Sequence, residues 1–269
     1  MPLAVCATPI GNLEDVTLRV LRELGEADVV LCEDTRHTKG LLERHGVRAR
    51  LLSYHRHNEA SRVAELLPRL EAGERFALVS DAGLPGINDP GARLVTAALE
   101  AGVAVTVLPG PSAVETALVA SGLAGERFQF LGYLPRGEKA LGEVWAELAR
   151  WEHPAVAFES PQRLTATLRS LAAALPQRRV AVCRELTKRF EEVVRGTAAE
   201  LGERFAAAPK GEITLVVGGG EAEVDEGAAL GAVRELVGAG VPRRQAADVV
   251  GRLLSLSRNT LYRESLQSD

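Results

Sequence analysis

The chain has 269 residues, of which 46% are hydrophobic, and this is sufficient to form the cores of two domains of ordinary size. A formal net charge of −4 excludes a protein that binds nucleic acid over its whole surface, so any RNA contact must be local. No run of residues is long and apolar enough to cross a bilayer, and the first residues lack the pattern of a secretion signal. We therefore expect a cytoplasmic protein with no membrane partner.

Short apolar segments alternate with helical patterns through the first 121 residues. The predicted strands are 3–8, 28–33, 48–54, 75–81 and 103–109. Helical patterns lie between them at 13–26, 60–71 and 91–100. Because strands that alternate with helices form a mostly parallel sheet, we predict an α/β domain over residues 1–121.

A second alternating set predicts another α/β domain over residues 122–218. Its expected strands are 128–135, 155–160, 179–185, 190–196 and 212–218. Its expected helices are 138–151, 162–174 and 197–207. The fold class is thus α/β, with two such domains.

The last fifty residues differ from the rest in charge. Residues 218–227 contain four acidic side chains and no basic one, which indicates an acidic linker at 219–227. Six arginines and two acidic residues lie between 234 and 263, a net charge of +4. Helical patterns at 228–238, 243–254 and 256–266 predict a basic helix-turn-helix-like tail over 228–269.

Neither the cysteines nor the histidines form a metal-site pattern. Cys6, Cys32 and Cys183 lie in apolar runs without a CxxC pair, so they are predicted to be core residues. His55 and His57 could form a pair of ligands, but no third ligand has a suitable spacing. We expect no metal.

Irregular loops follow three predicted strands of the first domain. The first strand ends in TPIGN (8–12), without the GxGxxG of dinucleotide-binding proteins, and the chain has no Walker A sequence. A long loop follows at 80–91, and a second Gly-Pro loop follows at 109–113. Open α/β sheets bind ligands at this edge, where glycine lets the backbone approach a ligand closely. The alternatives are that Asp81 caps a turn and that Ser112 caps the following helix.

Two strand ends carry runs of charge. In CEDTRHT (32–38), Asp34 or Thr35 could cap a helix, whereas Arg36 and His37 are harder to explain in this way. In RELTKR (184–189), Glu185 or Lys188 could assist removal of a proton, and Arg184 could hold a phosphate. The alternative for this second run is a solvated, charged turn.

Seven segments together resemble the tetrapyrrole-methylase superfamily, and more narrowly its members that methylate small-subunit ribosomal RNA. They are, in chain order, ATPIGNL, CEDTRHT, SDAGLPGINDPG, LPGPSA, FESPQRL, RELTKRFEEVVRGT and GEITLVV. The resemblance spans residues 3–217, and the basic tail is similar to the helix-turn-helix extension of the rRNA methylases. The chain lacks the GxGxGD opening and the GDP loop of general members.

The resemblance implies a class III methyltransferase with S-adenosylmethionine in a cleft between the two domains, usually in a homodimer. It implies 2′-O-methylation of cytidine 1402 in 16S rRNA, within the 30S subunit. The cofactor contacts that it implies are Pro9, Asp81, Ala82, Gly83, Ser112, Ala113, Phe158 and Gly196. Glu185 and Lys188 are the catalytic candidates, and the candidates for RNA contact are Arg36, His37, Arg184, Arg243, Arg244, Arg252 and Arg258.

Two other functions are open at this point. One is a related methylase that acts on a small molecule such as a tetrapyrrole, or on the diphthamide precursor of a translation factor. The basic tail, which compact small-molecule methylases lack, argues against it. The other is a nucleic-acid-binding regulator that senses a ligand in the same cleft without catalysing a reaction.

Overall fold

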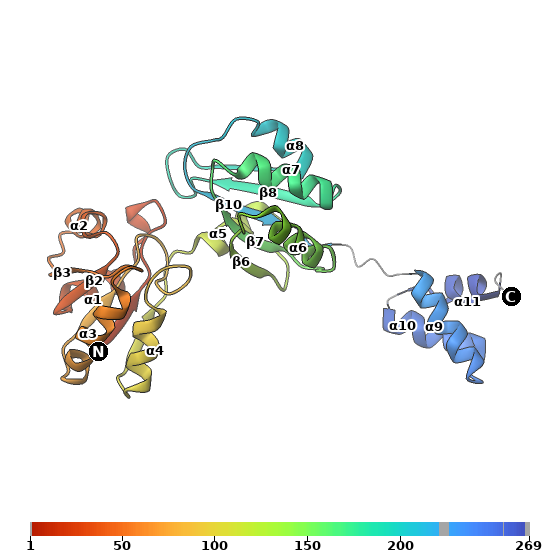
Figure 1. Ribbon diagram of the computed structural model, residues 1–269, viewed down its shortest axis with the longest axis horizontal. Helices are drawn as coiled ribbons and strands as arrows, with labels where there is room; N and C mark the ends of the chain where they lie inside the picture. The colour runs from red at the N-terminus through yellow and green to blue at the C-terminus, as the bar shows by residue number, and fades with distance from the viewer. Residues whose placement is uncertain (1, 221–225, 255, 267–269) are drawn as a thin grey trace. The chain divides into compact units, whose positions relative to one another are not determined.

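A computed structural model describes residues 2–220, 226–254 and 256–266. The chain forms two compact units, one of Met1–Ala149 with His153–Gly219, and one of Arg150–Glu152 with Gly220–Asp269. The first unit contains two five-stranded sheets, and the second contains helices (Figure 1). Within the described residues, no helix has the length and apolarity needed to cross a membrane.

The first sheet is parallel throughout, as the alternating pattern predicts. Its strand order is β3-β2-β4-β1-β5. The strands are β1 (Leu3–Cys6), β2 (Val29–Cys32), β3 (Leu51–Ser53), β4 (Phe76–Leu78) and β5 (Val105–Leu108). The connecting helices are η1 (Leu13–Asp15), α1 (Leu18–Glu26), α2 (Thr35–Arg44), α3 (Glu59–Glu71) and α4 (Ala92–Glu100).

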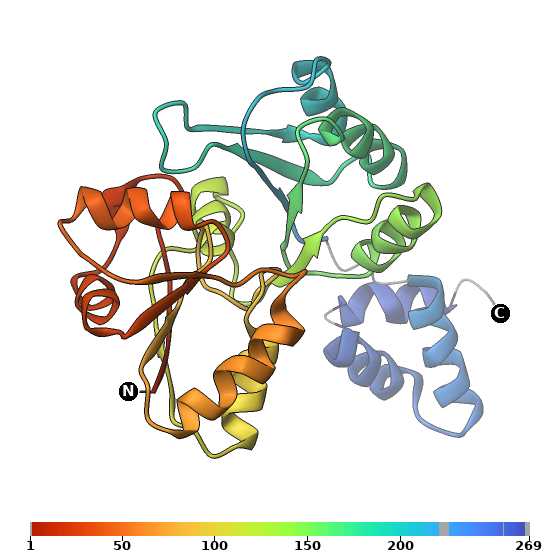
Figure 2. The ribbon, with the colours of Figure 1, turned by 60° about the vertical axis from the view of Figure 1, so that its left-hand side comes forward.

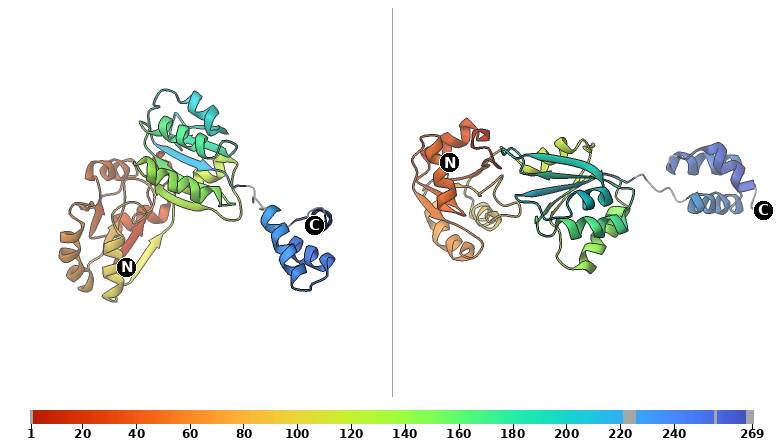
Figure 3. Two further views of the ribbon diagram at one scale, coloured as in Figure 1. Left: turned by 45° about the vertical axis from the view of Figure 1, so that its right-hand side comes forward. Right: turned by 90° about the horizontal axis from the view of Figure 1, so that it is seen from above.

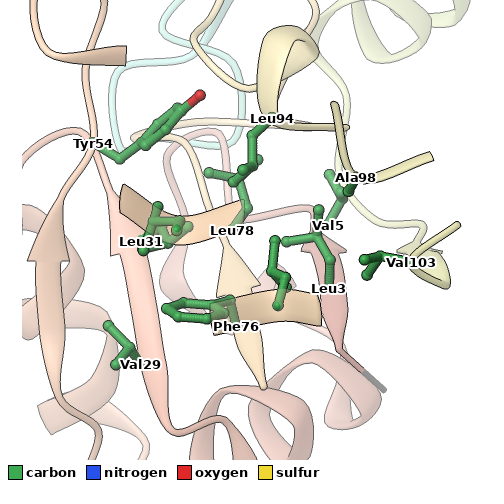
Figure 4. Close-up of a cluster of buried hydrophobic side chains, with 12 residues drawn as sticks. Leu3, Val5, Val29, Leu31, Tyr54, Phe76, Leu78, Leu94, Ala98 and Val103 are labelled. Atoms are coloured by element: carbon green, nitrogen blue, oxygen red, sulfur yellow. The ribbon is translucent and has the colours of Figure 1, made fainter. Parts of the chain in front are cut away.

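Alternate residues of the central strands pack into two different cores. Leu3 and Val5 of β1 face the layer that contains Leu94 of α4 (Figure 4). Leu66 of α3 belongs to the same core. Figure 2 shows these two helices side by side. Ala4 and Cys6 point the other way, into a core with residues of α1 and α2. Because both faces are covered, the strands are continuous apolar runs.

The second sheet is largely antiparallel, which the sequence pattern did not specify. Its order is β6-β7-β10-β8-β9, and only β6 and β7 run parallel. The strands are β6 (Gln129–Tyr133), β7 (Ala155–Glu159), β8 (Arg179–Arg184), β9 (Glu192–Thr197) and β10 (Ile213–Val217). A short loop joins β8 to β9 and turns the chain back on itself, whereas a parallel pair would need a crossover connection.

Helices cover both faces of the second sheet. These are α5 (Ala113–Ser121), α6 (Glu138–Ala149), α7 (Leu164–Ala174) and α8 (Ala198–Arg204). Helix α5 lies before residue 121, the expected end of the first domain, yet its Ala117 and Leu118 pack on this sheet. Figure 3 (right) shows α5 on one face and α6 and α7 on the other. The helices expected at 138–151 and 197–207 end earlier, at Ala149 and Arg204.

The second unit contains three helices in the part of it that is described: α9 (Glu226–Gly238), α10 (Arg243–Leu254) and α11 (Arg258–Leu266) (Figure 3). Its small core is formed by Ala229, Val233, Ala246, Ala247, Val250 and Leu261. Glycine is required at Gly251, because a Cβ there would lie 2.9 Å from the carbonyl oxygen of Leu256. Residues 221–225 of the expected acidic linker lie outside the described residues.

Two glycines form a matched test of the packing in the first unit. A Cβ at Gly11 would lie 2.5 Å from Cγ of Lys188 and 2.8 Å from the carbonyl oxygen of Leu186, so Gly11→Ala should lower the free energy of unfolding by ~1–3 kcal/mol. A Cβ at Gly40 in α2 would meet nothing within 4 Å, so Gly40→Ala should raise it by up to ~1 kcal/mol. Urea denaturation measures both. Equal effects would contradict the close contact at Gly11.

Candidate functional site

The loops that follow β1, β4 and β5 meet at the carboxyl edge of the first sheet, as the sequence predicts. Thr8 and Gly83 exchange two backbone hydrogen bonds, with N–O distances of 2.8 and 3.0 Å. The Thr8 hydroxyl also donates to the carbonyl oxygen of Ser80, at 2.9 Å. The third loop comes close because Gly110 has no side chain, and a Cβ there would lie 2.9 Å from Cβ of Ala7.

A cavity of about 650 Å³ opens at this edge, within the first unit. The first sheet's loops contribute Asp81, Ala82, Gly83, Ser112 and Ala113, all named as cofactor contacts from the sequence. The second sheet contributes Phe158, together with Phe130 and Tyr133. A volume of this size is typical of sites for small molecules and cofactors.

Two of the expected cofactor contacts do not line this cavity. Pro9 is buried beside Ile10, which does line it. Gly196 lies in β9 at the edge of the second sheet, where a Cβ would come within 2.8 Å of Oε2 of Glu200. Its lack of a side chain makes room for the carboxylate of Glu200, which accepts from the backbone N–H of Thr197 at the start of α8. The structure therefore gives Gly196 a packing role.

Three aromatic rings form one wall of the cavity. The Phe130 and Phe158 rings are 5.0 Å apart and edge-on, and the Tyr133 ring lies 5.4 Å from that of Phe158. Tyr133 is 66% exposed, whereas Phe158 behind it is partly buried. Of these three rings, the family resemblance implies only Phe158 as a contact. The alternation of a β-strand does not distinguish Tyr133 from a surface residue.

Three acidic side chains, Glu33, Asp81 and Asp89, also line the cavity, and sequence reasoning named only Asp81 as a cofactor contact. Asp81 accepts a hydrogen bond from the backbone N–H of Asp34, at 3.2 Å. Burial, with added repulsion from Asp81, raises the pKa of Glu33. Burial and repulsion from Glu33 and Asp81 raise the pKa of Asp89 to about 6. These shifts show that the carboxylates lie close enough to repel one another in a partly desolvated space.

The loop that carries Asp81 and Asp89 is held from both sides. The Glu59 carboxylate accepts from the backbone N–H of Gly91 at 2.9 Å and from the Tyr54 hydroxyl at 3.1 Å. On the other side, Asn88 has a left-handed φ of 63°, and its Oδ1 lies 3.0 Å from where a Cβ on Gly132 of β6 would be. Gly132 therefore allows the loop to approach the second sheet.

The charged run after β2 functions mainly as a helix start. Asp34 caps α2 by accepting from the backbone N–H of Arg36 at 2.8 Å, and it also binds the Arg36 guanidinium at 2.6 Å. Arg36 is 88% exposed along its side chain, and His37 is exposed as well. Ser112 stands at the start of α5, but its hydroxyl donates to the Glu115 carboxylate and does not cap the helix. The capping role considered for that hydroxyl is therefore wrong.

Glu185 and Lys188 belong to a cluster of three charges beside the cavity. The ammonium of Lys188 donates to Glu185 and to Glu212, at 2.9 Å each, and Glu212 lines the cavity. The backbone N–H of Glu212 and the Lys188 ammonium lower the pKa of Glu185. Burial alone would lower the pKa of Lys188, but the two carboxylates outweigh it and raise the pKa. Both side chains are thus held in their charged forms near neutral pH.

The loop around this cluster is strained and is attached to the first sheet's side of the unit. Glu185 and Thr187 have left-handed φ values of 52° and 64°. The Thr187 hydroxyl accepts from the backbone N–H of Asn12, at 3.0 Å. Left-handed conformations at residues other than glycine are costly and often mark functional sites. Arg184 is used internally, since it binds Glu192 at 3.0 Å and the carbonyl oxygen of Lys210 at 3.1 Å.

The four arginines predicted to bind RNA from the second unit divide into two pairs. Arg243 donates to the carbonyl oxygen of Ser265, and Arg258 lies 3.7 Å from Asp248. Arg244 and Arg252 are exposed on α10. Of the four, Arg244 and Arg252 therefore have the guanidinium groups most available to a phosphate.

In the part of the chain that the structure describes, no group of three or more His, Cys, Asp and Glu side chains is arranged to hold a metal ion. The His55 and His57 rings are 5.9 Å apart and edge-on. All three cysteines are buried, as predicted for core residues.

Solved methyltransferases share this two-sheet fold. A solved uroporphyrin-III C-methyltransferase from Thermus thermophilus, complexed with S-adenosyl homocysteine, superposes with a TM-score of 0.56 at 20% identity over 80% of this chain and 96% of its own. The methyltransferase CobJ gives 0.62 at 21% identity, over 81% and 93%. At these identities the likeness establishes the fold.

The sequence places the chain in the same class. Residues 2–202 match the signature of the Tetrapyrrole (Corrin/Porphyrin) Methylases, and the chain belongs to this family. It is 43% identical to a protein of Mesorhizobium japonicum named ribosomal RNA small subunit methyltransferase I, over 98% of this chain and 91% of that relative. A Thermotoga maritima protein of the same name is 43% identical over 81% of this chain and 99% of its own length.

The crowded carboxylates predict a pH-dependent change in stability. With its pKa raised to about 6 in the folded state, Asp89 contributes most stability when protonated, and this contribution is lost as the pH rises through 6. Asp89→Asn should therefore raise the free energy of unfolding by about 1–2 kcal/mol at pH 8, after allowance for solvent screening. The gain should vanish as the pH falls toward 4.

Urea denaturation at pH 8 and at pH 4 measures this difference. Asp15→Asn is a matched control, because Asp15 is exposed and does not line the cavity. An equal effect of Asp89→Asn at the two pH values would contradict the raised pKa.

Proposed function

We propose that this chain transfers the methyl group of S-adenosylmethionine to the ribose 2′-hydroxyl of cytidine 1402 in 16S rRNA. The observation that carries the proposal is the 43% identity, over 98% of the chain, to a relative named for methylation of small-subunit ribosomal RNA. A small-molecule methylase has no such support, because the solved small-molecule methyltransferases share only the fold. A regulator without catalysis would not explain the relatives' name.

The cavity has features that suit S-adenosylmethionine. Gly83, with a φ of 77°, allows the backbone of its loop to approach a ligand where a side chain would be strained. Glu33 and Asp81 supply negative charge for a cofactor that carries a sulfonium and an ammonium group. Phe158 supplies an aromatic surface for the adenine. We assign the cofactor to Asp81, Ala82, Gly83, Ser112, Ala113 and Phe158, with Pro9 behind them in the buried first-strand turn.

The bound cofactor supplies an activated methyl group, and the chain's own task is to place the ribose hydroxyl in line with it. The hydroxyl must also lose its proton as the new C–O bond forms. Of the two catalytic candidates, Glu185 is in the ionised form that can take a proton, whereas Lys188 is already protonated. Lys188 is instead suited to stabilise the negative charge that develops on the ribose oxygen.

RNA binding is assigned to exposed cations around the site and in the second unit. Arg36 and His37 are exposed at the start of α2, and Arg244 and Arg252 are exposed on α10. Arg184, Arg243 and Arg258 are already engaged within the protein, so they are the weaker candidates.

An assembled 30S subunit suits a protein of this charge better than free RNA does. With a net charge of −4, the protein has no overall excess of cations to hold a flexible strand, and a pre-organised RNA surface lowers the entropy cost of binding. Such a substrate would place the protein in the cytoplasm. The homodimer remains part of the proposal through the family resemblance.

Ribose methylation of small-subunit rRNA tests the proposed function. In cells that lack this protein, the 2′-O-methyl group at cytidine 1402 should be missing, and the purified protein with S-adenosylmethionine should restore it to isolated 30S subunits. Primer extension at low nucleotide concentration and mass spectrometry of the fragment both detect it. Persistence of the methyl group without the protein would refute the proposal.

The charge cluster gives a second test, under single-turnover conditions with saturating subunits. If Glu185 assists removal of the proton, Glu185→Gln should reduce the rate by about 10²–10⁴-fold while both substrates still bind. Lys188→Met should also reduce the rate, because it removes the cation near the ribose oxygen. Matched controls are Glu138→Gln and Lys139→Met, two exposed residues of α6 that do not line the cavity.

The alternative is that both residues only shape the loop or contact a phosphate. A phosphate contact would weaken RNA binding, and its effect would disappear at saturating RNA. Rates within a few-fold of wild type for both variants would leave orientation of the hydroxyl as the main source of catalysis.

A further inference from the structure

One aromatic side chain of the cavity is open to a planar ligand. Tyr133 ends β6, and the residue is 66% exposed although it lines the cavity. Its ring lies 5.4 Å from that of Phe158, which in turn lies 5.0 Å from that of Phe130. Contact with the tilted ring of Phe158 therefore helps to fix the position of Tyr133 while leaving it accessible. Proteins bind unstacked RNA bases on side chains of this kind.

Asp89 lines the same cavity as this ring and has an available carboxylate. The residue before it, Asn88, closely approaches the residue before Tyr133, because Oδ1 of Asn88 lies 3.0 Å from where a Cβ on Gly132 would be. No hydrogen bond or ion pair joins the Asp89 carboxylate to another residue within the described ranges, whereas the Asp81 carboxylate accepts from Asp34. The charged groups that act on Asp89 are Glu33, Asp81 and Arg56.

We propose that Tyr133 and Asp89 bind the target base, with the cytosine ring on Tyr133 and its exocyclic amino group donating to Asp89. This inference rests on the proposed function, because it requires that a cytidine be the substrate. A nucleoside that enters the cavity with its ribose leaves the RNA stack, and its base then needs a binding surface. Tyr133 provides the surface, and Asp89 provides the hydrogen-bond acceptor.

The chemistry of the acceptor explains why cytosine would be selected over uracil. The N4 amino group of cytosine donates to a carboxylate, which is the usual partner of that group in proteins. Uracil has a carbonyl oxygen at the same position, and two acceptors facing each other repel. A carboxylate at residue 89 therefore discriminates between two pyrimidines that stack equally well on a tyrosine ring.

The same geometry explains the position of the cluster formed by Glu185, Lys188 and Glu212. Tyr133, Asp89 and Glu212 line the same cavity. Glu212 in turn holds Lys188. A base on Tyr133 would thus bring its own ribose toward the two residues proposed to act on the hydroxyl.

Methylation of two matched substrates tests the assignment of Asp89. We would use 30S subunits that carry either cytidine or uridine at the target position, and measure kcat/KM for each. The wild-type protein should prefer cytidine by about tenfold or more. Asp89→Asn should reduce this preference to a few-fold, because the carboxamide can turn its NH₂ group toward the uracil oxygen. Asp15→Asn, outside the cavity, should keep the wild-type preference.

Two outcomes would overturn the inference, and both are distinct from failure of the proposed function. An unchanged preference in Asp89→Asn would remove Asp89 from base recognition. A loss of S-adenosylmethionine affinity in calorimetry, in proportion to the loss of activity on both substrates, would assign Asp89 to the cofactor. If the wild-type protein methylates neither substrate, the proposed function itself fails.

Substitutions at Tyr133 provide a second readout that does not depend on Asp89. Tyr133→Leu should raise the KM for subunits by about 5- to 100-fold, since base stacking on an aromatic ring is lost. Tyr133→Phe should restore it, because the ring remains. Equal KM values for the leucine and phenylalanine variants would exclude stacking.

Discussion

The site depends on one backbone contact, the pair of hydrogen bonds between Thr8 and Gly83. These bonds join the turn after β1 to the loop after β4, so that the two loops form one wall. Buried backbone N–H and C=O groups must be paired. The two loops lie beyond the ends of their strands, and there the groups of Thr8 and Gly83 pair with each other. Gly83 can take part because its φ of 77° costs a glycine little. The acidic residues and the loop after β5 are placed relative to this wall.

A second constraint joins the two sheets of the first unit. Gly11 lies directly against Lys188 and Leu186, and Asn12 donates to Thr187, so the loop that carries the catalytic candidates is fixed from the first sheet's side. Asn88 and Gly132 form a similar close approach on the other side of the cavity. Each contact needs a glycine, Gly11 in the first and Gly132 in the second. Each also involves a residue with a left-handed φ, which is Thr187 in the first and Asn88 in the second. The residues that fix the walls of the cavity therefore include strained ones, which lower the stability of the fold.

Much of the fold could be predicted from the sequence, because it is local. Continuous apolar strands such as β1 and β2 can only be buried on both faces, and this implies a parallel sheet with helices on each side. The loops with Gly83 and Gly110 could be placed at one edge because parallel strands end together. The cysteines could be assigned to the core because their neighbours are apolar.

The remaining features depend on contacts between distant segments. Glu33, Asp89 and Tyr133 come together only because the loop after β4 reaches β6, and no spacing in the sequence reports that approach. The direction of the second sheet follows from the short connection between β8 and β9. Gly196 matches the family pattern, but its local reason is the carboxylate of Glu200. A glycine within a family motif can therefore be needed for packing inside the protein and not for contact with a ligand.

The claim on which the account depends is that the cavity behind Gly83 binds S-adenosylmethionine. Calorimetric titration of the wild-type protein, Gly83→Val and Gly137→Val tests it most directly. A Cβ at Gly137 would meet nothing within 4 Å, so this variant controls for the added side chain. We expect the wild-type protein and Gly137→Val to bind the cofactor alike, and folded Gly83→Val to lose binding. Unchanged affinity in folded Gly83→Val would contradict the account.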